Sequence, residues 1–500
     1  MTDQLRSKTV KAVGYLSLGS ALGKVFSLGT TLILARLLTP EDYGLMAMSM
    51  IVIDFIGFFN EVGIGSAIVQ KKNLTDAEVN GCFAIALISS TVLFLATIIA
   101  SPFIADFFNT PHLQLIISIL AIAFILGAFS TVPLAFLRKG MHFKIIAGVT
   151  LLSVITNSLV CLALASMGKG VWSLVWGFIA SSVVQTACYF ILSHWRPKKP
   201  YGIREAMGLV VYGLHVTSSR IFWFAYSNAD KVIIGKLLGI RPLGIYDMAF
   251  SLATLPSGQI TSLVTNVASP LFSKLQHDLP RLSSVILKLS RGIAYATYPA
   301  LIGMLATSRE LIAVVLGTKW VDILIPFAAL CLMGLIKSVD PLLSQVLIAT
   351  GHAKKLSAYT ALCGIVMSIS VVVGAYFDGL RGVSLVWVLI YPMLSAKLLY
   401  DTCKITGMRM FDYYKSLLPV LMGSLAMGGI VLSVREIALY FSLALPIVLT
   451  LEIVIGFLSY LLWVIYFDRH GINEIRQVMI DAGVPENRFN RWPFVREKST

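Results

Sequence analysis

Positively charged side chains inside apolar sequence are the residues of this chain that could do chemistry. The apolar stretch 13–37 is expected to be a helix, and one of its faces carries polar residues at steps of three and four: Ser17, Ser20, Lys24, Ser27 and Thr31. The positions 200 residues later are again mostly polar: Thr217, Arg220, Phe224, Ser227 and Lys231. Ammonium and guanidinium groups bind phosphate oxygens, and arginine can do so bidentately. We therefore expect Lys24, Arg220 and Lys231 to bind an anionic group.

The depth of these cations within their helices separates two interpretations. A cation near the bilayer centre costs about 3 kcal/mol on insertion scales, so Lys24 and Arg220, well inside their segments, are expected to face a wet cavity. Arg36 and Lys236 lie near segment ends, where reaching for the interface is the preferred interpretation. The alternative for all of them is pairing with internal carboxylates, for which the candidates are Asp54, Asp230 and Asp247.

Other polar side chains in apolar segments are candidates for the cavity or for ion coupling. Lys337 and Asp340 are three residues apart, which favours an internal pair over a site. His215 could titrate, but a lone helical histidine is more often simply hydrogen-bonded. Asp54 is either the partner of Lys24 or a cation-coupling site, and the sequence leaves both open. Asp230, directly before Lys231, is a further candidate for the same cavity.

The motifs of several enzyme classes are missing from the chain. The sequence around Lys24 contains Gly-Lys, but the phosphate loop GxxxxGK[ST] fails at Leu18 and Val25. The six cysteines are scattered singly, without metal or pairing spacing. The segments expected outside the membrane on the outer side are short, the longest being about 101–112. We therefore predict that the protein is not an enzyme and that it has no catalytic residues, no metal and no bound cofactor.

The composition defines the solvent in which this chain folds. Of its 500 residues, 57% are hydrophobic and 13% are charged, and the mean hydropathy is +0.83, whereas soluble domains carry about 25% charged residues. Apolar runs of roughly 20 residues recur along the chain, each long enough to cross a hydrocarbon core of about 30 Å. We expect an all-α integral membrane protein in which the first apolar run is a mature helix and not a cleaved signal.

About fourteen transmembrane helices are expected. They cover residues 13–37, 43–60, 80–101, 113–136, 145–167, 171–193, 209–234, 243–270, 292–316, 321–349, 356–377, 383–403, 416–434 and 439–467. With both termini in the cytoplasm, most Lys and Arg residues fall in cytoplasmic segments, as the positive-inside rule requires. The net charge of +15 thus indicates orientation and attraction to anionic lipid, and nucleic acid is not expected as a partner.

An internal repeat organises these helices. At an offset of 200 residues, Ile33, Leu37, Leu38, Gly44 and Met48 recur as Ile233, Leu237, Leu238, Gly244 and Met248. The repeat predicts two six-helix lobes, 1–194 and 209–405, joined by a basic cytoplasmic linker, 195–208. Two additional helices, 406–467, and a basic cytoplasmic tail, 468–500, follow. Six crossings separate the repeat mates, so the repeats are parallel, and substrate is expected to bind between them.

Several segments, in this order, carry a resemblance to a known family. They are ILARLLTPEDYGLMAM (33–48), EVGIGSAIVQKKNLT (61–75), LRKGMHFK (137–144), DKVIIGKLLGIRPLGIYDMAFSLATLPS (230–257), VASPLFSKLQHD (267–278) and LGTKW (316–320). From end to end the chain resembles the polysaccharide transporter branch of the multidrug/oligosaccharidyl-lipid/polysaccharide exporter superfamily. Within that branch it looks most like the colanic acid exporter (Wzx-type) group.

The resemblance implies a fold, an activity and a location. The expected fold is a V-shaped pair of six-helix bundles with two extra helices, working by alternating access. The expected activity is that of a flippase in the bacterial inner membrane, which moves an undecaprenyl-diphosphate-linked oligosaccharide from the cytoplasmic to the periplasmic leaflet. Members carry cations in their lumen, for which Lys24, Arg220 and Lys231 are the candidates here. An H+ or Na+ gradient would drive the cycle, and a polysaccharide polymerase and glycosyltransferases would be partners.

Two other functions fit parts of the sequence. A cation-coupled multidrug antiporter would share the architecture, but more carboxylates and fewer cations would be expected in its cavity. A membrane scaffold for polysaccharide assembly would act through its basic tail, Arg469 to Lys498. The two polar stripes favour the flippase over both.

Overall fold

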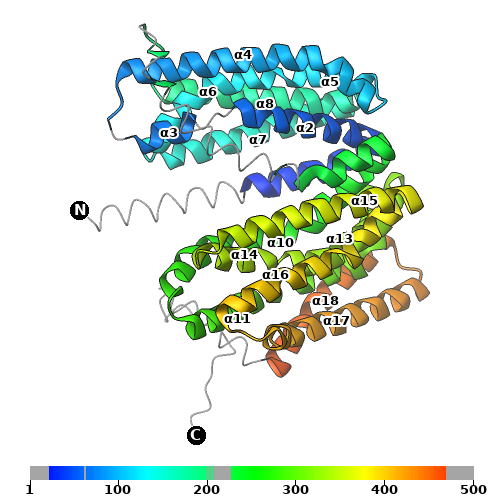
Figure 1. Cartoon of the computed structure of the whole chain (residues 1–500). Helices are drawn as coiled ribbons and strands as arrows, with labels where there is room; N and C mark the ends of the chain where they lie inside the picture. The colour runs from blue at the N-terminus through cyan, green and yellow to red at the C-terminus, as the bar shows by residue number, and fades with distance from the viewer. Residues whose placement is uncertain are drawn as a thin grey trace. The chain divides into compact units, whose positions relative to one another are not determined.

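Helices make up every regular element that can be described in this protein. The computed structural model describes residues 22–60, 64–71, 73–199, 202–203, 206–207, 224 and 227–468. Within these residues no strand occurs, and long helices follow one another along the chain (Figure 1). The all-α fold class expected from the hydropathy pattern is confirmed.

The chain divides into two compact units, Met1–Gly244 and Ile245–Thr500. Residues 22–37 and 227–237 of the first unit are helical. Its other helices are α2 (Pro40–Asn60), α3 (Ile64–Gln70), α4 (Asp76–Phe107), α5 (His112–Leu120), α6 (Ile122–Lys139), α7 (Phe143–Ser166) and α8 (Val171–Leu192). The first unit also includes the first five residues of α10 (Ile240–Leu275), beyond the linker predicted at 195–208.

The second unit contains the rest of α10 and all later elements. These are α11 (Leu279–Ala306), α12 (Ser308–Leu311), η1 (Ile312–Leu316), η2 (Thr318–Ile323), α13 (Leu324–Lys337), α14 (Asp340–Ala349), α15 (Ala353–Leu389), α16 (Tyr391–Thr406), α17 (Met410–Tyr440) and α18 (Leu445–Phe467). The last two helices are joined to this unit by packing, since α17 lies along α11 and α18 along α17 (Figure 1).

The number of membrane spans differs from the predicted fourteen. Among the described residues, nine segments are long and apolar enough to cross a membrane. A tenth arises if Leu279–Ala306 and Ser308–Leu316, bent by 75° relative to each other, count as one span. The total of fourteen is therefore not confirmed. Part of the difference has a plain cause, because the expected spans 13–37 and 209–234 lie partly outside the described residues.

One of the nine segments is a hairpin of two helices. The segment Ala353–Thr406 has 54 residues, and helical geometry is interrupted at Asp378 and Gly379, where Gly379 has a φ of 53°. A Cβ atom on Gly382 would lie 2.0 Å from the carbonyl oxygen of Gly374, so the chain turns back on itself there. The predicted spans 356–377 and 383–403 correspond to the two arms of this hairpin.

Local signals in the sequence start the first long helices. At α2, Pro40 occupies the first helical turn, where its missing N–H costs nothing. Thr39 and Asp42 exchange hydrogen bonds, with the Thr39 N–H donating to Asp42 Oδ2 at 2.9 Å. At α4, Thr75 and Glu78 form a capping box. These caps satisfy N–H groups that would otherwise be unpaired at the membrane boundary.

Large apolar side chains lie on the outside of the helices as well as in their cores. Ile99, Tyr376 and Phe457 are 69%, 86% and 66% exposed, respectively. In water such faces would aggregate, whereas in a bilayer they contact acyl chains. The surface thus agrees with the composition in assigning the protein to the membrane.

The repeat detected in the sequence has a reciprocal contact in the first unit. A Cβ atom on Gly44 would lie 2.0 Å from the carbonyl oxygen of Ile240, and one on Gly244 would lie 1.9 Å from that of Pro40. The repeat-related Glu41 and Arg241 form an ion pair, with 3.0 Å between Oε1 and Nη1. The start of α2 and the start of α10 therefore pack backbone against backbone, which only glycine permits.

We predict that Gly244→Ala lowers stability, because the new methyl group must displace backbone. Overpacking of this kind costs about 1–3 kcal/mol. Gly258→Ala on the same helix is the matched control, since a Cβ there has no atom within 4 Å. Thermal unfolding of purified protein in detergent measures both variants. Equal melting temperatures for Gly244→Ala and wild type would contradict the close packing.

Candidate functional site

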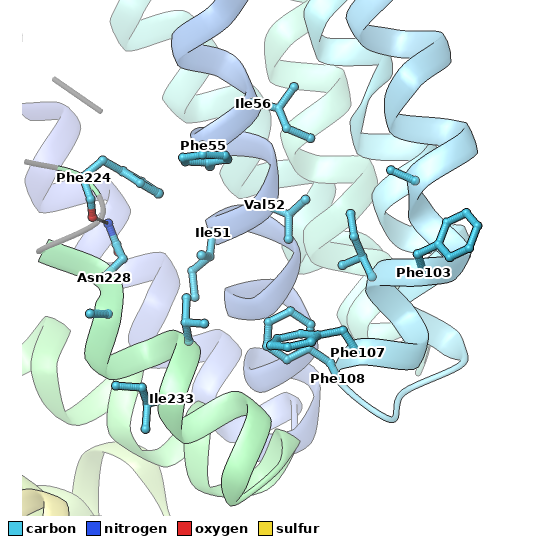
Figure 2. A pocket seen from close by; sticks show the side chains of 14 residues that line it. Ile51, Val52, Phe55, Ile56, Phe103, Phe107, Phe108, Phe224, Asn228 and Ile233 are labelled. Atoms are coloured by element: carbon cyan, nitrogen blue, oxygen red, sulfur yellow. Dashed lines mark hydrogen bonds between the residues drawn. The ribbon is translucent and has the colours of Figure 1, made fainter. Parts of the chain in front are cut away.

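An apolar pocket of about 670 Å³ lies within the first unit. It is bounded by α2, by α4 near its C-terminal end, by Phe224 and by residues 228–233 (Figure 2). All of its lining residues except Asn228 are apolar, and five of them are phenylalanines: Phe55, Phe103, Phe107, Phe108 and Phe224. The volume is in the range of ligand sites, about 300–1,000 Å³. Such a wall suits a hydrocarbon chain or a flat apolar group.

Aromatic contacts hold one end of this pocket. The ring of Phe224 lies 5.2 Å from that of Phe58 and 6.0 Å from that of Phe55, between ring centroids. Asn228 Nδ2 donates to the carbonyl oxygen of Phe224 at 3.1 Å, as the close-up shows (Figure 2). The one polar side chain of the lining is thus turned to its own backbone, which keeps the pocket apolar.

The two helices beside the pocket are amphipathic in the same way. On α2 the lining positions are 51, 52, 55 and 56, and on the helical residues 227–237 they are 228, 229, 232 and 233. At 100° per residue, Asp54 and Lys231 each lie about 130° around their helix from the middle of this face. Each of the two helices therefore carries an apolar face toward the pocket and a charged side chain, Asp54 or Lys231, on another side.

Lys236, near the C-terminal end of the helical residues 227–237, contacts α4. Its Nζ lies 4.8 Å from the ring centroid of Phe107 and donates to the carbonyl oxygen of the same residue. A cation over an aromatic ring gains about 0.5–2 kcal/mol. These contacts give Lys236 a structural role near a helix end, the role preferred for it on sequence grounds.

The first polar stripe is described from Lys24 onward. Lys24 and Ser27 are exposed, as are their apolar neighbours Val25 and Phe26, whereas Leu34, seven residues after Ser27 and so on the same helix face, is 4% exposed. That the stripe faces a wet cavity stays a prediction. Arg220 and His215 lie outside the described residues.

The remaining candidates of the first unit lie next to Lys231. Asp230 is buried, and its Oδ1 accepts a hydrogen bond from the backbone N–H of Lys231 at 2.9 Å. Asp54 is exposed on α2, and the cation that acts on it is Lys231. The structure thus brings Asp54 near Asp230 and Lys231, from which it is 176 and 177 residues away in the sequence.

Lys337 and Asp340 belong to the second unit and sit on two different helices. α13 ends at Lys337 and α14 begins at Asp340. Asp340 accepts hydrogen bonds from Tyr391 Oη at 2.9 Å and Ser395 Oγ at 2.7 Å, which satisfies both carboxylate oxygens. Lys337 Nζ lies 5.0 Å from the ring centroid of Phe250 and 5.1 Å from that of Trp387. These contacts support a structural role for both side chains.

The pocket phenylalanines were missed on sequence grounds. In a chain with 27 phenylalanines, Phe103 and Phe107, one turn apart on α4, are not distinguished from lipid-facing residues by spacing. The polar stripes could be seen because polar residues are rare in apolar segments.

In the part of the chain that the structure describes, no group of three or more His, Cys, Asp or Glu side chains could hold a metal ion.

Comparisons with known proteins connect this chain to polysaccharide biosynthesis. A family model described as "Polysaccharide biosynthesis protein" matches residues 33–325. Lipopolysaccharide biosynthesis protein WzxC of Escherichia coli (strain K12) is 24% identical over 388 residues, which cover 77% of this chain and 79% of that protein. Succinoglycan biosynthesis transport protein ExoT of Rhizobium meliloti (strain 1021) is 26% identical over 329 residues, 64% of this chain and 65% of that protein.

A solved structure shares the fold. Lipid II flippase MurJ in an inward closed conformation matches with a TM-score of 0.71 at 15% identity, over 91% of this chain and 99% of that one. At this identity the likeness concerns the fold alone. The chain thus has a fold that a flippase also uses.

Proposed function

Because this chain belongs to the family of polysaccharide biosynthesis proteins, we propose that it is a flippase for a lipid-linked oligosaccharide. Its substrate is an undecaprenyl-diphosphate-linked repeat unit. The protein moves this unit from the cytoplasmic to the periplasmic leaflet of the bacterial inner membrane, for exopolysaccharide, capsule or O-antigen synthesis. Both termini are cytoplasmic, and a polymerase and glycosyltransferases work on either side of this step.

The observation that carries the proposal is that α2 and the helical residues 227–237 present an apolar face on one side and a charged residue on another. The apolar pocket lies on one side of α2 and residues 227–237, and Asp54 and Lys231 lie on another. A polyprenyl diphosphate has the same division, with a hydrocarbon tail and an anionic head. A ligand whose two parts meet matched surfaces gains specificity from both. A purely polar or purely apolar substrate would use only half of this arrangement.

The residues have distinct roles in the proposed cycle. Part of the polyprenyl chain occupies the pocket beside Phe103 and Phe224, while the remainder stays in lipid. Lys24 and Lys231, with Arg220, meet the diphosphate, and the water-filled cavity around them spares the sugars from hydrocarbon. Alternating access, in which the two repeats move against each other, then exposes the head on the periplasmic side.

The other functions considered lack a supporting observation of their own. A multidrug antiporter fits the fold, but the family match and the relatives' names concern polysaccharides. The relative from Rhizobium meliloti is named as a transport protein, which agrees with a transporter and not with an enzyme or a scaffold.

We predict that Ala100→Trp slows flipping about tenfold or more. The indole would fill the pocket, and an overpacking cost of about 1–3 kcal/mol to tail binding corresponds to roughly a tenfold change per 1.4 kcal/mol. The measurement is the rate at which a fluorescent polyprenyl-diphosphate oligosaccharide crosses the membrane of proteoliposomes. Ala96→Trp, one turn earlier on α4 and exposed, is the matched control and should flip at the wild-type rate. Equal rates for both variants would exclude the pocket from the transport path.

A second prediction concerns the anionic head. Lys231→Gln removes a charge-assisted contact worth about 1.5–3 kcal/mol, so flipping should fall roughly 10- to 100-fold. The same assay with an uncharged polyprenyl glycoside should show little difference between Lys231→Gln and wild type. Lys354→Gln, at an exposed position of α15, controls for loss of net charge. Wild-type flipping of the diphosphate by a well-folded Lys231→Gln protein would refute the assigned role.

A further inference from the structure

A buried charged cluster lies in the second unit, and none of its residues belongs to the pocket or to the polar stripes. Glu310 is on the short helix α12, Arg435 on α17 and Glu452 on α18. α18 packs against both α12 and α17. Arg435 Nε donates to Glu310 Oε1 at 2.8 Å. No part of the proposed path for the oligosaccharide uses these residues.

Glu452 is the unusual member of this cluster. It is 0% exposed, and neither of its carboxylate oxygens has a hydrogen-bond partner. Glu310 is 3% exposed, and its Oε2 is also without a partner. Buried polar atoms are nearly always hydrogen-bonded, so three such oxygens in one place require an explanation. An ionised carboxylate in this state would be very costly in hydrocarbon surroundings.

The charges of the cluster do not balance. Two carboxylates and one guanidinium leave one negative charge if all three are ionised. Glu310 and Arg435 are the charged groups that act on Glu452 among the described residues. Of the other charged groups on the elements that pack against α18, Arg309 on α12 is exposed, and Arg291 on α11 pairs with Asp468, 16 residues beyond Glu452. Arg435 already binds Glu310. One further positive charge is needed to make the cluster neutral, and it must bind at Glu452, because Arg435 is already paired with Glu310.

The surroundings favour a proton over a metal ion as that charge. Hard cations take about six or more oxygen ligands, and the cluster offers the three free oxygens of Glu310 and Glu452. One turn beyond Glu452, a Cβ atom on Gly456 would lie 2.9 Å from a methyl carbon of Val431, so α17 and α18 are too close for a hydrated ion. A proton needs one oxygen and little space.

We propose that Glu310, Arg435 and Glu452 form a proton-binding site in which Glu452 is the group that takes up and releases the proton. Uptake converts the Glu452 carboxylate to a carboxylic acid and makes the cluster neutral, which suits the closed, dry packing described here. Release leaves a net negative charge, which favours a state in which water reaches α18. No bond to the oligosaccharide forms or breaks in either step. Resting on the proposed flippase function, this site couples an inward proton movement to translocation.

Infrared spectroscopy of the full chain in lipid tests the site without any oligosaccharide. Wild type should show the C=O stretch of a protonated carboxylic acid at neutral pH, and raising the pH should remove it. The band should be absent in Glu452→Gln, which keeps the shape of the side chain, and shifted in Glu452→Asp. Glu436→Gln is the control, because Glu436 is exposed beside Arg435 on α17. Identical spectra for wild type and Glu452→Gln would overturn the proton site.

Proteoliposomes test the coupling separately. With a tenfold proton ratio across the membrane, wild type and Glu436→Gln should flip the fluorescent oligosaccharide lipid several-fold faster than without it. In Glu452→Gln the ratio of these two rates should fall to one. An unchanged ratio in Glu452→Gln would overturn the coupling. Absence of flipping in wild type together with a normal infrared band would overturn the flippase function and leave the proton site standing.

Discussion

The constraint on which this structure depends is the cost of an unpaired charge in hydrocarbon. Most of the buried charged side chains described here offset that cost through contacts with specific partners. Asp340 accepts from two hydroxyl groups, Lys337 lies over two aromatic rings, and Arg435 binds Glu310. Because structural charges are satisfied in this way, Glu452, whose carboxylate oxygens have no partner, marks a place where an ion is exchanged.

Polar residues were informative in the sequence for the same reason. In an apolar chain every internal charge is visible, so the stripe containing Lys24 and the candidates Asp54 and Lys231 could be identified without a structure. The repeat was also visible at Gly44 and Gly244, although its reason, two backbones in contact, was not. Hydropathy gave the fold class and most helices, including the two arms of the hairpin around Gly379.

What the sequence could not show depends on contacts between distant or unremarkable residues. Phe103 and Phe224 look like any lipid-facing phenylalanine, and only their convergence makes a pocket. Glu310, Arg435 and Glu452 come from three separate segments with no shared spacing. The start of α10 belongs to the first unit because Gly244 packs against Pro40, a contact that composition does not encode. Arg220 and His215 lie outside the described residues, so their roles stay predictions from the sequence.

The measurement that tests the proposed substrate path most directly is photocrosslinking in membranes. A polyprenyl-diphosphate oligosaccharide with a diazirine on its chain is photolysed with the full-length protein, and the labelled peptides are identified by mass spectrometry. We expect label at the buried lining residues Ile51, Phe108 and Phe224, and competition by unlabelled polyprenyl diphosphate. Label confined to outward-facing residues such as Tyr376 and Phe457, unaffected by competitor, would contradict a specific site for the lipid tail in the first unit.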